Sequence, residues 1–452
     1  MRKVLSGLAA AAILLLPVLV NAAETELVKN NKVKVGIYER IRYEYFKNVP
    51  DLNSSIKDNK SYFRFKTSPS VEYDFAKDAD VYVRLTNENR AYTYWAGASA
   101  SAGKSASKKG YHYDINETVF DNLYLDWNNI LEAPVSLRVG RQDLEGYGEG
   151  FIFKNGTPLD GTRTFYFNAG KLSWQVNDKN SLDLIAIRDT KTDVYLPVIN
   201  ELNPRQALNS SNEYAFSLYH KTDSIQNLHW ENYYVYKHED ASPTARMTRE
   251  ETKLNTIGTY AKYNLDPSLA LRGQIAGQFG DYGKNDRTGI GGYLFVDKDF
   301  KKASWSPQFS AGAIYLSGNN RSTSTNETWD PLFSRDTWHS VLYASYYSNE
   351  TENSYWTNLQ MYRASVSVKP IDKLKLTLWY NYLRANNQVA ATKTLFSGTG
   401  KERGHLPQLR LDYAISKDIN TYVLAEYFVP GNFYVKSADD AFFLRWELTY
   451  KY

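Results

Sequence analysis

Charged side chains recur at every second position near the start of the chain, as Arg40, Arg42 and Glu44. A guanidinium group binds a carboxylate through two parallel hydrogen bonds, which an ammonium group cannot do. Arginines gathered on one face would lower the barrier for an anion to enter, and interleaved acids would hold them extended and keep the anion from binding too tightly. Further arginines at positions of this kind are Arg64, Arg84, Arg138, Arg410 and Arg445.

Other constellations that carry chemistry are missing from the sequence. The six histidines show no metal-ligand spacing, and the chain contains no cysteine, no G-x-S-x-G elbow and no phosphate-binding loop. Ser217 and His220 lie close in sequence but cannot be assigned to a catalytic pair. We therefore expect no enzymatic activity, no cofactor and no metal, and a barrel enzyme or an adhesin stays only as a remote alternative.

The elements that would position these charges are two-faced β-strands. From Phe442 to Tyr452 every second residue is apolar or aromatic, and the residues between are mostly polar. Such a strand occurs at the edge of a soluble sheet, but about 9–11 residues with one apolar and one polar face also cross an outer membrane within a closed barrel. Because the pattern recurs along the whole chain, we predict an all-β fold, a transmembrane antiparallel β-barrel.

The connections between the alternating stretches are of two kinds. Short ones are rich in Asp, Asn, Lys and Pro, as tight turns are, and long ones would lie outside the cell. An even strand number is needed for both chain ends to lie in the periplasm, which predicts about 18 strands if residues 318–354 form one external loop that folds inward or caps the pore. The other long external loops are expected at about residues 90–113, 143–160, 189–212 and 384–404.

Bulk composition agrees with one large barrel rather than several soluble domains. The chain has 452 residues, of which 37 are Tyr, 20 are Phe and 10 are Trp. Aromatic belts at two membrane interfaces would use this excess. The mean hydropathy of −0.53 is polar, which argues against helical membrane spans but not against strands that are half apolar. We expect a single barrel domain over residues 23–452.

The first residues predict export. Arg2 and Lys3 precede an uncharged run from Leu5 to Val20, and small residues follow up to Ala22. This is the pattern of a cleaved secretory signal peptide, here residues 1–22. Its removal lowers the formal charge from +4 to +2, which is too even a balance to indicate a nucleic-acid partner.

One stretch resembles a known family. Val139-Gly140-Arg141-Gln142-Asp143-Leu144, a glycine-rich segment at residues 146–150, and Leu159-Asp160-Gly161-Thr162-Arg163 are similar to the signature of the alginate export porins of bacterial outer membranes. The resemblance implies an eighteen-stranded barrel with an arginine-rich, anion-selective pore for a polyuronate. The residues it places at or near the constriction are Arg40, Arg42, Glu44, Arg138, Arg141, Gln142, Asp160 and Arg163.

The same stretch also has a purely architectural interpretation. Gly140 would mark a bend, and Arg141 with Asp160 would form an ion pair that anchors a loop. The loop after Leu144 departs from the family pattern, because it has Phe151-Ile152-Phe153-Lys154 in place of basic residues and Trp. Likewise, any wide barrel fills its interior with paired charges, whatever passes through it.

These observations predict an outer-membrane channel that passes anionic oligo- or polysaccharide, such as an alginate-like uronate, by passive diffusion. The alternative is a general diffusion porin for small solutes with little selectivity. The expected partners are the saccharide, outer-membrane lipid and, by the resemblance alone, periplasmic secretion or scaffold proteins. We expect a monomer in the bacterial outer membrane.

Overall fold

Strands make up most of the structure, a computed structural model. It describes residues 32–49, 52–56, 59–95, 112–154, 166–209, 211–243, 248–334, 339–343, 356–392 and 395–452. The predicted signal peptide and the residues Asp160 and Arg163 therefore lie outside the described residues. In the described part of the chain, no helix is long and apolar enough to cross a membrane.

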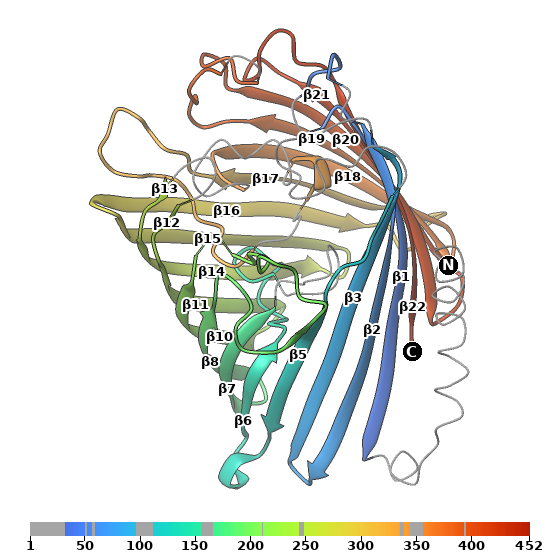
Figure 1. Cartoon of the computed structure of the whole chain (residues 1–452), viewed down its shortest axis with the longest axis vertical. Helices are drawn as coiled ribbons and strands as arrows, with labels where there is room; N and C mark the ends of the chain where they lie inside the picture. Colours follow the sequence, from blue (N-terminus) through green and yellow to red (C-terminus); the bar gives the residue numbers. More distant parts are fainter. Residues whose placement is uncertain are drawn as a thin grey trace.

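The strands form one closed antiparallel barrel of 18 strands, which confirms the predicted fold class. Each strand pairs with its neighbours in the chain, and Figure 1 shows them in that order round the wall, from β1 in blue to β22 in red. In the first half they are β1 (Val33–Lys47), β2 (Lys60–Ala76), β3 (Ala79–Trp95), β5 (Thr118–Trp127), β6 (Val135–Gln142), β7 (Phe167–Asn177), β8 (Asn180–Asp189), β10 (Glu213–Ile225) and β11 (Leu228–Glu239). In the second half they are β14 (Thr252–Asp266), β15 (Leu269–Tyr282), β16 (Asn285–Asp299), β17 (Gln308–Leu316), β18 (Leu359–Ile371), β19 (Leu374–Arg384), β20 (Glu402–Ala414), β21 (Ile419–Pro430) and β22 (Ala441–Lys451).

Several short elements decorate this barrel. Strand β4 (His112–Asp114) pairs with β3, and β9 (Val198–Ile199) pairs with β5. Strands β12 (Ser242–Pro243) and β13 (Thr248–Arg249) form a separate two-stranded sheet, and a 3-10 turn, η2, covers Ile130–Glu132.

The barrel closes where the last strand meets the first. Strand β22 pairs with β1 in antiparallel register, with Arg42 opposite Glu447 and Glu44 opposite Arg445. Closure removes the free edges that an open sheet would present, so every strand of the barrel wall has two partners. The terminal strand that the sequence predicted therefore completes the wall.

Alternation sorts the side chains of each strand between the two faces of the wall. On β14, Ile257 is 57% exposed, whereas Thr256 beside it is fully buried. Period 2 places successive side chains on opposite faces, so apolar residues meet lipid and polar residues face the lumen. On β15 and β16 the outward side chains of Ile275 and Leu294 are similarly exposed.

The long connections lie together at one end of the barrel, because the strands alternate in direction. Tight turns at the opposite end join β2 to β3, β7 to β8, β14 to β15 and β18 to β19. Two expected loops are shorter than predicted, since β3 continues to Trp95 and β20 begins at Glu402. The connection between β17 and β18 spans the expected long loop, and no barrel strand interrupts its described residues.

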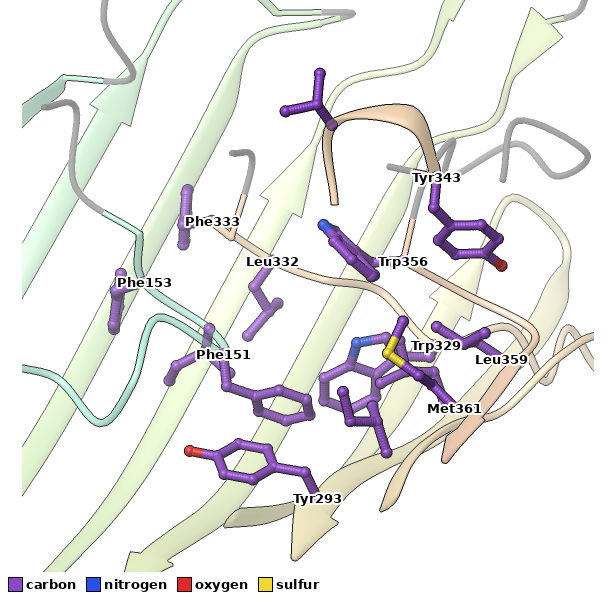
Figure 2. Packing of buried hydrophobic residues seen from close by; sticks show 14 of the residues in the cluster. Phe151, Phe153, Tyr293, Trp329, Leu332, Phe333, Tyr343, Trp356, Leu359 and Met361 are labelled. Carbon is purple, nitrogen blue, oxygen red and sulfur yellow. The ribbon is translucent and has the colours of Figure 1, made fainter. Parts of the chain in front are cut away.

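Two of these long connections fold into the barrel and meet there. Phe153 and Phe333 stack with their rings 5.6 Å apart, and Phe151 stacks on Trp329 at 5.1 Å (Figure 2). The backbone N–H of Phe333 donates to the carbonyl of Ile152 at 3.0 Å. The segment after β17 thus turns inward, and together with the segment after β6 it forms a buried apolar cluster inside a polar wall.

The inward segment is also tied to the wall. The Glu426 carboxylate on β21 accepts hydrogen bonds from the Ser340 hydroxyl at 2.7 Å and from the backbone N–H groups of Val341 and Leu342 at 3.1 and 3.0 Å. Each fully buried Phe or Leu side chain contributes about 1.5–3 kcal/mol relative to exposure. Apolar burial and these hydrogen bonds together hold the segment in place.

Candidate functional site in the barrel lumen

The inward charges of the predicted site concentrate at the closing seam, and they are paired. Arg40 donates to Glu88 at 2.5 Å, and Arg42 donates to Glu447 at 2.5 Å. Arg64 contacts Glu88 at 2.8 Å and Glu44 at 3.1 Å, and Arg445 Nε donates to Glu44 at 2.8 Å. We refer to these residues of β22, β1, β2 and β3 as the seam network: Arg40, Arg42, Glu44, Arg64, Glu88, Arg445 and Glu447.

Every side chain of the seam network is buried. Desolvation of buried charges is costly, and only close pairing with several hydrogen bonds offsets it. Glu88 accepts from Arg40 and Arg64, and Glu44 accepts from Arg64 and Arg445. Carboxylates therefore neutralise these arginines, and the network joins four strands of the wall.

Arg84 connects the wall to an inward loop. Its Nη2 lies 2.8 Å from Asp121 on β5 and 2.9 Å from Asp143, the first residue after β6. Burial raises the pKa of the Asp143 carboxyl, and the neighbouring Arg84 opposes this rise. Arg84 thus holds the start of the segment that turns into the lumen.

Arg138 lies on the lumen face and is more accessible than the seam network. It binds Asp126 through two hydrogen bonds of 2.7 and 2.6 Å, and its guanidinium lies 4.0 Å from the centre of the Tyr124 ring. Its side chain is 29% exposed. A flat cation held on an aromatic face beside a carboxylate is rigid, which suits contact with a passing solute.

Arg141 lies on the opposite face of the wall from the expected position. It pairs in register with Leu123, whose neighbour Tyr124 faces the lumen, and it binds Asp193 through two hydrogen bonds of 2.9 and 2.8 Å. Asp193 belongs to the connection between β8 and β10. The architectural interpretation expected a loop-anchoring pair for Arg141, and the structure shows one with a different acid.

Gly140 explains the local path of this strand. Its φ of 132° is unfavourable for other residues, and a Cβ there would lie 2.3 Å from the Leu123 carbonyl oxygen. Gln142 is buried and donates to the Ala169 carbonyl at 2.9 Å. This part of the motif therefore shapes the wall where the inward loop leaves it.

A second set of inward cations has no carboxylate within 4 Å in the described part of the chain. Lys171 on β7 pairs in register with Arg138, and Arg363 on β18 contacts Asn381 at 3.1 Å and the Trp379 ring at 5.3 Å. We refer to this set as the open cations: Lys171, Lys262, Arg363 and Lys375. Sequence reasoning missed them, although strand parity alone places each on a lumen face.

One cavity brings an open cation beside an aromatic ring. It has a volume of about 380 Å³ and lies at the short-turn end between β19 and β22. Its lining includes Lys375, Arg410, Asp412 and Tyr422. Arg410 contacts Asp412 at 2.7 Å and lies 3.8 Å from the Tyr422 ring centre. Aromatic rings with adjacent cations and acceptors are surfaces that a charged sugar can contact.

The inward segment places one titratable group near the cations. Burial lowers the pKa of His339 well below its usual 6.5, and the positive charges of Arg363, Lys154 and Arg272 act in the same direction. His339 is therefore neutral at pH 7. Within the described residues, no three His, Asp or Glu side chains are arranged to hold a metal ion.

Comparison with known protein families shows which family this chain belongs to. A family model described as alginate export matches residues 31–445. The chain belongs to the alginate export family. No curated protein matches it. Membership of this family, together with the barrel fold, indicates an outer-membrane channel, and the chain resides in the bacterial outer membrane.

Several solved structures share the fold of this chain. OccK5 (OpdH) of Pseudomonas aeruginosa has 11% sequence identity and a TM-score of 0.55, covering 93% of this chain and 98% of that one. OccAB4 of Acinetobacter baumannii has 11% identity, the same coverage and a TM-score of 0.57. A BenF-like porin from Pseudomonas fluorescens Pf-5 has 9% identity, the same coverage and a TM-score of 0.57. At these identities the likeness shows an outer-membrane porin fold.

Proposed function

We propose that the barrel conducts anionic oligo- or polysaccharides of the uronate type across the outer membrane by passive diffusion. The observation that carries this proposal is the set of open cations, which line the lumen with no carboxylate within 4 Å among the described residues. Membership of the alginate export family supports a uronate as the solute.

Opposing surfaces in the lumen fit a charged sugar chain. Arg138 and Lys171 lie side by side on β6 and β7, and Arg363 lies on β18. Lys375 stands near Tyr422 in the cavity at the short-turn end. Uncompensated cations lower the barrier for an anion, and their separation along the wall lets the anion leave each site again.

The neutralised seam network favours a second candidate, a general diffusion porin. If the paired arginines set the field of the lumen, the net charge there is small and selectivity would be weak. The two functions differ in one measurable property, the ratio of anion to cation permeability, and in whether a uronate blocks the current.

Planar bilayers test the proposal directly. Reversal potentials in a KCl gradient should show anion preference, and an oligouronate should block the current where a neutral oligosaccharide of equal length does not. The double variant Lys171→Gln/Arg363→Gln should lose most of both effects, because each substitution removes an open cation. Arg384→Gln is the matched control, since Arg384 is exposed on β19 with outward parity.

Two results would refute the uronate channel. One is cation preference in the unmodified protein. The other is equal block by uronate and neutral sugar, which would favour the general porin.

A further inference from the structure

The outer surface of the barrel has a hollow between β6, β7 and β8. Its volume is about 580 Å³, and its lining is largely apolar. It exists because small residues, Gly170 and Ala186, occupy outward positions where neighbouring strands carry Leu123 and Val139. Apart from Gly170 and its two chain neighbours, no atom of the described residues lies within 4 Å of the place where a Cβ on Gly170 would stand.

A connection at the long-loop end forms a roof over this hollow. Tyr195 and Leu196, between β8 and β10, contribute to the lining. The pair of Arg141 and Asp193 fixes this connection to the wall, with Nη2 to Oδ1 at 2.8 Å. The Tyr166 hydroxyl also donates to Asp193 at 3.1 Å. The buried pair of Arg141 and Asp193 therefore holds in place the connection that covers the hollow.

A row of polar and aromatic side chains crosses the outer face at the level of the hollow's upper edge. Arg188 on β8 pairs in register with Tyr214 on β10, Tyr214 with His238 on β11, and His238 with Lys253 on β14. The Arg188 guanidinium lies 5.4 Å from the Tyr214 ring centre, and the rings of Tyr214 and His238 are 5.8 Å apart. Below this row the outward residues are apolar, including Phe216 and Leu218.

Arg188 differs from the other cations of this row. His238 and Lys253 both contact Glu251, at 2.9 and 3.2 Å. Arg188 is exposed and has no carboxylate within 4 Å among the described residues. It is the second-last residue of β8 at the long-loop end, which is the depth of the headgroups in the outer leaflet.

We propose that the hollow and Arg188 form one lipid site for lipopolysaccharide of the outer leaflet. One acyl chain fills the hollow over Gly170 and Ala186, beneath Tyr195 and Leu196. Arg188 donates two hydrogen bonds to a glucosamine phosphate at the membrane surface, the geometry that guanidinium groups favour with phosphate. The charge of Arg188 and the apolar lining of the hollow together select a lipid that has both a phosphate group and an acyl chain.

Native mass spectrometry of the full mature protein in detergent micelles tests this site. The probes are hexa-acyl lipid A with two phosphates, the same lipid without phosphates, and phosphatidylglycerol. We expect one lipid A to be retained, and both other lipids to bind at least about tenfold more weakly, which corresponds to about 1.4 kcal/mol. Arg188→Gln should weaken lipid A binding about tenfold and leave the dephosphorylated lipid unaffected.

Gly170→Leu tests the hollow separately, because the new side chain enters open space and fills the place of the acyl chain. Gly277→Leu is its control, since the place of a Cβ on Gly277 is likewise open among the described residues, and Gly277 lies on β15, away from the hollow. Arg384→Gln is the control for Arg188→Gln. Retention of phosphatidylglycerol equal to that of lipid A would overturn the proposal, as would equal weakening in the controls and the test variants.

Discussion

Two stretches of the lumen wall both carry cations but differ in whether carboxylates neutralise them. At the seam, Arg40, Arg42 and Arg64 are buried against carboxylates. On β18 and β19, Arg363 and Lys375 face the lumen with no carboxylate within 4 Å in the described part of the chain. The contrast teaches that a row of arginines in a strand does not by itself indicate an anion site. The charges on the adjacent strands decide whether it binds an anion or holds the wall together.

The largest expected effect comes from breaking the seam network. Glu88→Ala removes the carboxylate that Arg40 and Arg64 share and leaves both arginines buried without it. Loss of one partner of a buried pair costs about 3–5 kcal/mol. Urea unfolding in lipid vesicles should show this loss in the free energy of unfolding, while the anion preference of folded channels should stay unchanged.

Glu88→Gln sharpens the same comparison, because it keeps a hydrogen-bond acceptor but removes the charge. Its free energy of unfolding should lie between that of the alanine variant and that of the unmodified protein. A seam variant that folds with full stability but loses selectivity would show that the network acts on the solute instead.

Arg363→Gln should have the opposite effect, with little change in stability and a clear change in selectivity. Among the described residues its guanidinium contacts neutral groups, Asn381 and the Trp379 ring, and its removal leaves no described carboxylate within 4 Å unpaired. We expect a change of less than about 1 kcal/mol in the free energy of unfolding and a clear fall in the anion to cation permeability ratio. A large loss of stability with unaltered permeability would assign Arg363 to the wall.

Acidification should loosen the inward segment beside the open cations and leave the seam unaffected. The pKa of His339 is well below 6.5 in the folded protein, so below pH 6.5 the released segment binds a proton that the docked segment does not. Docking is therefore most stable above pH 6.5, and it weakens by about 1.4 kcal/mol per pH unit below that value until the folded pKa is reached.

Hydrogen exchange of the peptide containing Val341 and Leu342, at pH 7.5 and pH 5 and corrected for the intrinsic rate, measures this loosening. His339→Phe removes the titrating group and should abolish the pH dependence. Persistence of the effect in that variant would assign it to other groups.

The smallest effect is expected at Arg138, which is paired with a carboxylate like the seam network but partly exposed like the open cations. Arg138→Lys keeps the charge but loses the two-pronged bond to Asp126 and the contact with the Tyr124 ring. A partly exposed pair of this kind contributes about 0.2–1 kcal/mol, and conductance should change little. A loss of uronate block in this variant would place Arg138 among the residues that contact the solute.

Strand alternation was enough to predict the fold and the faces of Arg40, Arg42 and Arg138. It also predicts the outer face for Arg141, which shares the parity of Val139, whereas the family resemblance predicted a position near the constriction. The partners could not be predicted, because Glu447 meets Arg42 across most of the chain length and only the register of β1 and β22 brings them together. The same holds for Phe151 and Trp329, whose contact depends on two loops entering one lumen.

The charges at the junction of β1 and β22 also constrain how the wall can be assembled. With the observed register, Arg42 lies opposite Glu447 and Glu44 opposite Arg445. A slip of two residues keeps every side chain on its proper face, yet one direction sets Arg42 against Arg445 and the other sets Glu44 against Glu447. Either error places like charges opposite each other at buried positions. Charge pairing between the first and last strands therefore disfavours a shifted register when the barrel closes.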